Sequence, residues 1–231
     1  LTLFGIRDHF HCCKFLMSDT YLTLSKPGEG EFKDRGSKFL GYAYPAETEA
    51  ACQEWLASVK KAHPKARHHC YAYRLGQSDD LFRANDDGEP SSTAGRPILG
   101  QIDRLGLTNV VVVVVRYFGG TLLGTSGFIN AYRAAAAEAL EQAEIEEKVI
   151  ENVYRMQFGY DLMDKVMTAV SRLQLKILDQ QFDNAGQMDF AIRQSEAAQI
   201  LLQLKAIVGD LYLEEAEAVE KIEGFSVERI D

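Results

Sequence analysis

The stretch from Asn109 to Gly127 reads NVVVVVVRYFGGTLLGTSG and indicates the fold of the surrounding chain. Its six consecutive valines are typical of a strand that is buried on both faces in a covered sheet. The run is too short to cross a membrane. Glycines follow it, and the alanine-rich segment 128–142 is predicted to be a helix. The unit is therefore strand, glycine loop and helix, where ligands often bind because glycine lets them approach the backbone and helix starts offer free N–H groups.

The glycine loop does not match the common nucleotide-binding patterns. Gly119 and Gly124 have the spacing of two P-loop glycines, but Thr125 stands where that motif places a lysine. The glycine order also differs from the dinucleotide fingerprint, and Ser126 lacks the spacing of a nucleophile elbow. The simpler interpretation is that these glycines make a tight strand-to-helix connection. The alternative is that the loop, including Gly120, binds an anion or a ligand's backbone.

The composition indicates a globular protein with an uneven charge distribution. The 231 residues allow one large or two small domains, and 25 Lys and Arg against 34 Asp and Glu predict no general affinity for nucleic acid. Residues 149–231 hold 8 basic and 15 acidic residues, so any basic surface is expected in the first part. The four cysteines, at positions 12, 13, 52 and 70, show no zinc-like spacing and fit a reducing cytoplasm. We expect a cytoplasmic protein without a cofactor, a metal or a membrane partner.

The first sixteen residues differ from the sequence that follows. Charged residues and histidines interrupt their apolar residues, which excludes the continuous apolar segment of a signal peptide. Met17 followed by Ser18 is typical of a natural start. Residues 1–16 are therefore predicted to be a non-native or disordered extension outside the fold.

The pattern of residues 17–147 predicts a first α+β domain. A strand around 21–24, ended by Pro27 and Gly28, is expected to pair with a second strand at 38–44. The helix that follows should bury Cys52, Leu56 and Val59 on one face. The remaining predicted elements are a strand at 69–75, a turn at 77–80, a long loop at 84–97 and a short helix ending at Gly106.

A charge-dense segment at 141–148 is interpreted as the boundary to a second domain, 148–218. Its strands are predicted at 149–158, 175–182, 187–193 and 211–218, and its helices at 161–173 and after Ser195, the expected cap. This is the βαββαβ order of a ferredoxin-like domain. Residues 219–231 are expected to be a charged tail. The chain as a whole is predicted to be an α+β protein of two domains.

Arg116 ends the valine strand and is a candidate site residue. Arginine is rarely buried alone, so it is expected either to pair with a carboxylate or to reach a ligand. The long loop reads ANDDGEPSSTAGRP and offers carboxylates if it folds over the end of this strand. The predicted binding site comprises Asp86, Asp87, Glu89, Arg116, Tyr117, Gly119, Gly120 and Gly124.

The loop carboxylates have two interpretations. They could act as metal ligands or as a general acid and base in a hydrolase that uses the loop 86–93 near Arg116. Turn chemistry at Gly88 and Pro90, with capping hydroxyls from residues 91–93, already accounts for the same residues. The candidate bases, His68 and His69, are consecutive in a strand and should point to opposite faces. We therefore assign no catalytic residue and leave enzyme activity open.

The segment 56–78 contains no Asp or Glu, while basic residues alternate with histidines and tyrosines. Positive charge beside exposed aromatic rings is how single-stranded RNA is commonly held, although a solvated helix end and an ordinary strand would look the same. The candidate nucleic-acid patch comprises Lys60, Lys61, Lys65, Arg67, His68 and Arg74.

Four segments together resemble the IMPACT family and its bacterial YigZ-like branch. They are ARHHC at 66–70, DDGEP at 86–90, TAGRP at 93–97 and VVVVRYFGGTLLG at 112–124, the last of which is specific to the family. The resemblance covers about residues 21–218. It implies a first domain with the fold of the second domain of a small-subunit ribosomal protein, and a second domain like the ferredoxin-like domain of elongation factor G.

The resemblance also points to translation. Eukaryotic members restrain a stress-activated kinase that phosphorylates an initiation factor, through an N-terminal domain to which the resemblance does not extend, so the kinase role is not carried over. No catalytic residue is implied. The sequence therefore predicts a translation-associated regulator that binds RNA or a ribosomal component. The alternatives are a hydrolase at the loop, or a regulator that binds a protein partner through the acidic second domain.

Overall fold

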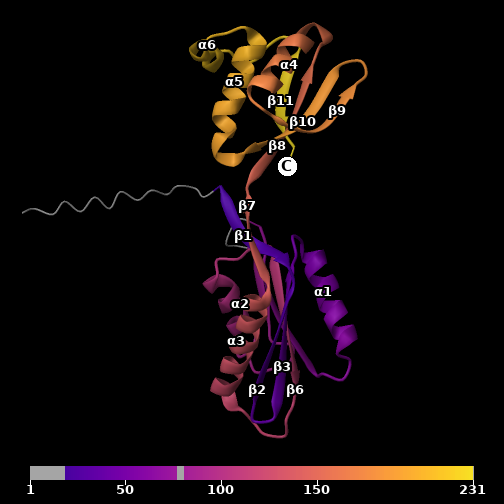
Figure 1. Ribbon diagram of the computed structural model, residues 1–231, viewed down its shortest axis with the longest axis vertical. Helices are drawn as coiled ribbons and strands as arrows, with labels where there is room; N and C mark the ends of the chain where they lie inside the picture. Colours follow the sequence, from indigo (N-terminus) through magenta and orange to yellow (C-terminus); the bar gives the residue numbers. More distant parts are fainter. Residues whose placement is uncertain (1–18, 77–80, 231) are drawn as a thin grey trace, which may run out of the picture. The chain divides into compact units, whose positions relative to one another are not determined.

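The structure is a computed structural model that describes residues 19–76 and 81–230 (Figure 1). The predicted extension 1–16 and the predicted turn 77–80 lie outside the described residues. The chain forms two compact units. The first is Thr20–Val149, and the described residues of the second are Asp19 and 150–230.

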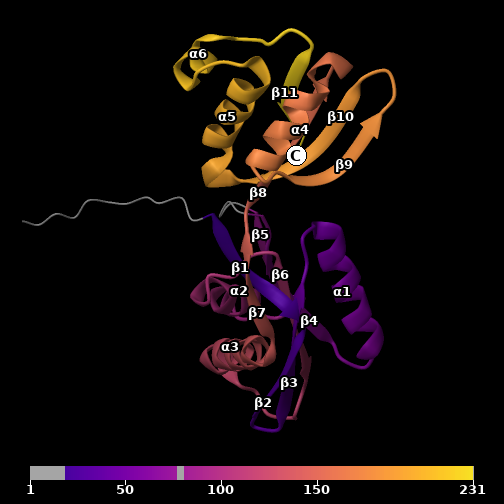
Figure 2. The same cartoon turned by 45° about the horizontal axis from the view of Figure 1, so that its top comes forward.

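A five-stranded antiparallel sheet forms the centre of the first unit, in the order β2-β3-β6-β4-β5. These strands are β2 (Gly28–Asp34), β3 (Ser37–Pro45), β4 (His68–Arg74), β5 (Phe82–Asn85) and β6 (Val110–Tyr117). Helix α1 (Glu49–Ala62) lies on one side of the sheet, and α2 (Gly95–Arg104) and α3 (Gly124–Gln142) lie on the other (Figures 1 and 2). The predicted α+β class is confirmed.

The valine run is β6, the central strand, and all six valines are fully buried. Val110, Val112 and Val114 belong to the core beneath α2 and α3, whereas the three alternate valines belong to the core beneath α1. Successive side chains of a strand point to opposite faces, so one strand supplies both cores. The valine run therefore shows no polar alternation because both of its faces are buried, as predicted.

The predicted pairing of the first strand is wrong. Gly28, expected to end that strand, instead begins β2, which pairs with β3. The first strand, β1 (Thr20–Lys26), instead pairs with β7 (Glu144–Val149), in the segment expected to be a charged boundary. Gly28 and Gly30 are needed in β2 because a Cβ at either position would lie 2.1 Å or 2.5 Å from the backbone of Ala139 in α3. The glycines serve close strand-helix packing rather than a turn.

Three element boundaries, two at the long loop and one at the glycine loop, also differ from the prediction. The strand β5 includes residues 84 and 85, α2 begins at Gly95, and α3 begins at Gly124 rather than at residue 128. Few residues of this loop are apolar, yet Glu89, Thr93 and Ala94 are all buried. The remaining loop, residues 86–94, is held by hydrogen bonds of its own carboxylates rather than by an apolar cluster.

The second unit has the ferredoxin-like order of elements. Its antiparallel sheet runs β11-β8-β10-β9. The first strand of the unit, β8, therefore lies between the third, β10, and the fourth, β11. The strands are β8 (Glu151–Phe158), β9 (Lys176–Phe182), β10 (Gly186–Arg193) and β11 (Phe225–Arg229). The helices are α4 (Met163–Arg172), α5 (Ala197–Gly209) and α6 (Leu213–Ala218), with short 3-10 turns η1 (Tyr160–Leu162) and η2 (Gln194–Glu196). The predicted βαββαβ order is confirmed.

The last strand of this order lies elsewhere than predicted. Residues 211–218 were expected to form it, but they contain helix α6, in which glutamate and alanine are favourable residues. The strand is β11, inside the segment 219–231 that was expected to be a charged tail, and Phe225 and Val227 pack against the core. Ser195 was expected to cap a helix, but its backbone N–H and its hydroxyl bond the carboxylate of Asp19. No helix in the described residues is long and apolar enough to span a bilayer.

Candidate functional site

Arg116 and Glu89 form a buried ion pair at the end of the valine strand. The Nη1 atom of Arg116 lies 2.7 Å from Oε1 of Glu89, and only 7% and 3% of the two side chains is exposed. The predicted pairing of Arg116 with a loop carboxylate is thus present in the structure. The partner is Glu89, and neither Asp86 nor Asp87 takes part in the pair.

Aromatic groups surround this ion pair. The hydroxyl of Tyr132, in α3, donates a hydrogen bond to the same Glu89 oxygen at 2.9 Å, and burial is the main cause that raises the pKa of Tyr132. The guanidinium carbon of Arg116 lies 4.5 Å from the ring centre of Phe128 and 5.5 Å from that of Phe118. Cation–π contacts of this kind stabilise a desolvated guanidinium. The end of β6 therefore holds a positive charge in an apolar shell.

Asp86 and Asp87 fix the shape of the loop. Asp86 accepts hydrogen bonds from the backbone N–H groups of Ser92, Ala94 and Gly95 at 2.8–2.9 Å, so it holds the start of α2. Asp87 accepts one from the backbone N–H of His69 at 2.7 Å. The prediction that hydroxyls of residues 91–93 cap the next helix is wrong, because the carboxylate of Asp86 accepts the hydrogen bonds at the start of α2. No cluster of three or more potential metal-ligating side chains occurs within residues 19–76 and 81–230.

A cleft of about 500 Å³ opens beside Arg116. Because β4 and β6 are antiparallel neighbours, His68 lies opposite Arg116 in the sheet. The basic patch and the sheet-end site, predicted separately, therefore meet in one place. The cleft is lined by Lys65, Arg67, His68, Arg116, Tyr117, Phe118, Leu122 and Phe128.

Three residues of the predicted basic patch do not line this cleft. Lys60 and Lys61 are exposed in the last turn of α1. Arg74 stands at the other end of β4, where it pairs with Asp103 at 2.7 Å. A strand rises about 3.3 Å per residue, so the six residues from His68 to Arg74 separate them by about 20 Å. The patch is continuous in the sequence but not on the surface.

The glycines of the predicted site have structural reasons to be glycine. A Cβ at Gly119 would lie 1.8 Å from the carbonyl carbon of Gly36 in the neighbouring turn. Gly120 and Gly124 adopt positive φ angles of 88° and 70°, which side chains disfavour. Their packing and conformation favour the tight strand-to-helix connection, and none of the three lines the cleft.

Comparison with known proteins identifies the family. The Impact N-terminal domain model matches residues 35–140. IMPACT family member YvyE of Bacillus subtilis is 31% identical over 180 residues, which are 78% of this chain and 83% of the relative. The chain belongs to the IMPACT family. Within this family it is 32% identical to IMPACT family member YigZ of Escherichia coli over 170 residues, 73% of this chain and 83% of YigZ.

A solved structure covers nearly the whole of this IMPACT family protein. The structure described as "Crystal structure of an hypothetical protein" superposes with a TM-score of 0.66 at 27% identity, covering 92% of this chain and 98% of the other. The match includes both units, so the two-unit architecture is shared with that protein.

A second polar cluster in this IMPACT family protein, on the α1 side of the sheet, was missed in the sequence. His63 bridges two tyrosines: its Nε2 lies 2.7 Å from the Tyr42 hydroxyl and its Nδ1 lies 2.9 Å from the Tyr117 hydroxyl. The ring of Tyr44 stacks on Trp55 at 4.1 Å. The sequence signal for this cluster is the alternation of tyrosines along β3, where Tyr42 and Tyr44 stand two residues apart.

This cluster predicts a loss of stability in mild acid. Burial is the main cause that lowers the pKa of both His63 and His69 in the folded protein. Unfolded histidines bind protons near about pH 6.5, so stability is present above that pH and falls as the pH drops toward the lower folded pKa values. We expect the urea midpoint of the first unit, followed by the fluorescence of Trp55, to fall between about pH 7 and pH 5.

A His63→Gln, His69→Gln double variant provides the control for this expectation. Its midpoint should change less with pH over the same range, because the two groups that bind protons on unfolding are gone. An equal change in the variant and the parent protein would assign the pH dependence to other groups.

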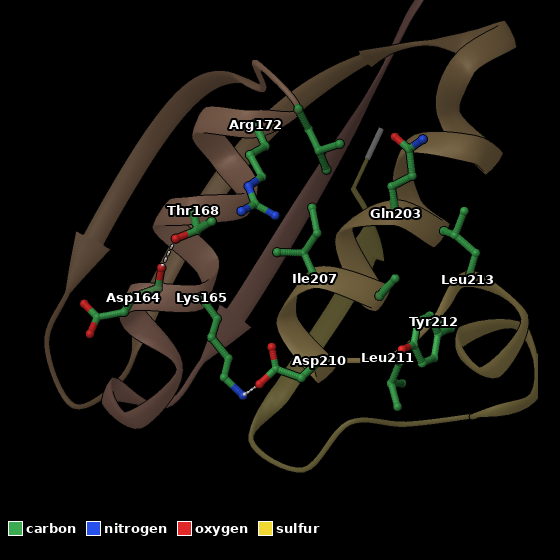
Figure 3. Close-up of a pocket in the computed structure, with 12 residues that line it drawn as sticks. Asp164, Lys165, Thr168, Arg172, Gln203, Ile207, Asp210, Leu211, Tyr212 and Leu213 are labelled. Atoms are coloured by element: carbon green, nitrogen blue, oxygen red, sulfur yellow. Dashed lines mark hydrogen bonds and ion pairs between the residues drawn. The ribbon is translucent and has the colours of Figure 1, made fainter.

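The second unit of this IMPACT family protein carries a larger groove, about 790 Å³, between α4 and α5. Arg172 and Ile207 point into the space between the helices, and Lys165 reaches Asp210 across one end at 2.7 Å (Figure 3). Tyr212 and Leu213, beside the groove, are 82% and 50% exposed. Both residues lie at the start of α6 rather than on α4 or α5. Binding of a protein partner by the acidic second unit stays a prediction, and this groove is the candidate surface for it.

Proposed function

We propose that this IMPACT family protein regulates translation by binding RNA of the ribosome or of a translation component through the cleft beside Arg116. The observation that carries the proposal is the meeting of Lys65, Arg67 and His68 with the exposed side chains of Phe118 and Leu122 in that cleft.

The cleft combines the two features that hold single-stranded RNA. Lys65 and Arg67 are exposed, and neither forms an ion pair within the described residues. They can therefore neutralise phosphates without breaking internal contacts. Phe118 is 60% exposed and offers a flat apolar face on which a base can stack. A local basic site of this kind is compatible with a chain of net charge -9.

Translation as the process is supported by the family. The resemblance to the IMPACT family implies a role in translation, and ribosomal material is the RNA that a regulator of translation meets most directly. The two cysteines of the described chain, Cys52 and Cys70, are free and buried, which fits the proposed cytoplasmic location.

The hydrolase alternative finds less support in the geometry. Asp86 and Asp87 accept hydrogen bonds from backbone N–H groups and Glu89 pairs with Arg116, so at least one oxygen of each carboxylate already serves the fold. A general base needs a lone pair that can reach substrate. The protein-partner alternative has the groove between α4 and α5 in its favour, and the experiment below separates it from RNA binding.

The test is a charge reversal inside the cleft. A Lys65→Glu, Arg67→Glu variant is expected to bind single-stranded RNA at least about tenfold more weakly at low salt, because two phosphate contacts become repulsive. The slope of log affinity against log salt should also become shallower by about two. Fluorescence anisotropy with a labelled oligonucleotide measures both quantities.

The matched control carries the same charge change elsewhere on the first unit. Arg83 and Arg96 are exposed, and neither lines the cleft. An Arg83→Glu, Arg96→Glu variant should keep most of the affinity. Equal losses in both variants would mean that net charge rather than the cleft determines binding, and absence of RNA binding by the parent protein at low salt would favour a protein partner.

A further inference from the structure

The floor of the cleft contains hydrogen-bond donors without a partner. An arginine carries five N–H donors, and within the described residues the guanidinium of Arg116 bonds only through Nη1, to Glu89. Its Nε is buried and has no hydrogen-bond partner. A buried donor that is left unsatisfied costs free energy, so it marks a position where an acceptor from outside is favourable.

The geometry of the free donors selects the acceptor. Nε and Nη2 of a guanidinium form a planar edge with two parallel N–H groups, which matches two oxygens of a phosphate. Since Glu89 already offsets the charge of Arg116, the unpaired Lys65 and Arg67 leave the cleft with about two surplus positive charges. A phosphate monoester carries a charge of about −1.5 to −2 at neutral pH, more than a phosphate inside an RNA backbone.

The shape of the cleft distinguishes an RNA end from an internal segment. Glu89 and Phe39 contact Arg116, Tyr132 contacts Glu89, and all three are buried, so the protein interior closes the cleft on that side of the guanidinium. An internal phosphate would require the strand to continue in two directions, whereas a terminal phosphate requires only one. Leu122, 80% exposed, and Phe118 remain for the adjoining nucleotide.

We propose that the cleft binds the phosphate-bearing end of a single RNA strand, with the phosphate on the free edge of Arg116 and beside Arg67, and the terminal base against Phe118. The inference rests on the proposed RNA-binding function. Nε of Arg116 is buried, so a phosphate reaches it only when a neighbouring side chain moves. The ring centre of Phe118 lies 5.5 Å from the guanidinium carbon, and because this side chain is 60% exposed, no packed core opposes its movement.

The experiment compares three oligonucleotides of one sequence, each labelled at an internal position. One ends in a 5′-phosphate, one in a 3′-phosphate, and one has hydroxyls at both ends. With the full chain, one phosphorylated oligonucleotide is expected to bind about tenfold more tightly than the hydroxyl-ended one, the scale of a charge-assisted bidentate contact. This preference should disappear in Arg67→Gln and shrink in Phe118→Ala, and it should persist in the control Arg96→Gln.

The possible results separate this inference from the proposed function. If all three oligonucleotides bind with equal affinity in a salt-sensitive way, RNA binding stands and the preference for a chain end is overturned. If none binds, the proposed function itself fails. If a nucleoside monophosphate competes as strongly as the phosphorylated oligonucleotide binds, the cleft is a site for a free nucleotide, which also overturns the inference.

Discussion

Replacing Glu89 by alanine is expected to destabilise the first unit by about 3–5 kcal/mol, the range for breaking one side of a buried ion pair. The change leaves Arg116 charged, 93% buried and without a carboxylate, and it removes the acceptor of the Tyr132 hydroxyl. The cation–π contacts with Phe118 and Phe128 remain, but they do not replace a charge-assisted hydrogen bond.

Trp55 is the single tryptophan of the chain and lies in the first unit, so urea unfolding followed by its fluorescence reports on that unit alone. Glu138→Ala, which removes an exposed carboxylate from α3, should change the free energy of unfolding by less than about 0.5 kcal/mol. An Arg116→Met, Glu89→Leu double variant should recover most of the loss, because apolar groups of similar volume often replace a buried ion pair without cost. A loss in Glu89→Ala below about 1 kcal/mol would show that water solvates Arg116 in the native state.

The central strand was predictable because its signal is local. Six consecutive valines leave neither face of the strand polar. Arg116 at their end was expected to need a partner, and the loop 86–94 supplies a carboxylate for it. The second unit was also predictable in its order of elements, since α4, α5 and most strands carried their own periodicity, whereas α6 was mistaken for the last strand. These predictions depend on which side chains must be buried, and that information is present in the sequence.

The missed strands depend on contacts between distant segments. β2 contains glycines and charges that indicate a turn, and the reason for the glycines is α3, more than a hundred residues later. β7 is mostly charged, because only one other strand, β1, pairs with it. In β11, Phe225 and Val227 alternate with polar residues over only five positions, too few to distinguish a strand from a tail.

The same difference between local signals and contacts of distant segments applies to the candidate site. Five of the residues that line the cleft were predicted, in two separate groups, whereas Phe118, Leu122 and Phe128 were missed. The register that places His68 opposite Arg116 is a property of the β4-β6 pairing. The same register carries Arg74 to the other end of the sheet. Side-chain chemistry was thus predictable from residue types, whereas the assembly of one site from two segments required the three-dimensional pairing.

Replacing Gly41 by alanine is expected to destabilise the first unit by about 3 kcal/mol or more, at the upper end of the usual cost of overpacking. Gly41 lies in β3, and a Cβ there would stand 2.3 Å from the carbonyl oxygen of Ala135 in α3. The obstacle is backbone in the middle of a 19-residue helix, so no side chain can turn away to relieve it. Either the helix must move off the sheet, which opens the core, or β3 must distort between its two neighbours.

Gly100→Ala makes the same chemical change at a position where the expected sign is reversed. Gly100 lies inside α2, and a Cβ there would meet nothing within 4 Å. Alanine should therefore stabilise the helix by about 0.5–1 kcal/mol, through the lower conformational entropy of the unfolded chain and the better helix propensity. Opposite shifts of the Trp55 unfolding midpoint in the two variants would assign the effect at Gly41 to the close approach of α3. A neutral result at Gly41 would instead mean that sheet and helix stand farther apart than the structure places them, and the explanation of the glycines in β2 would fail with it.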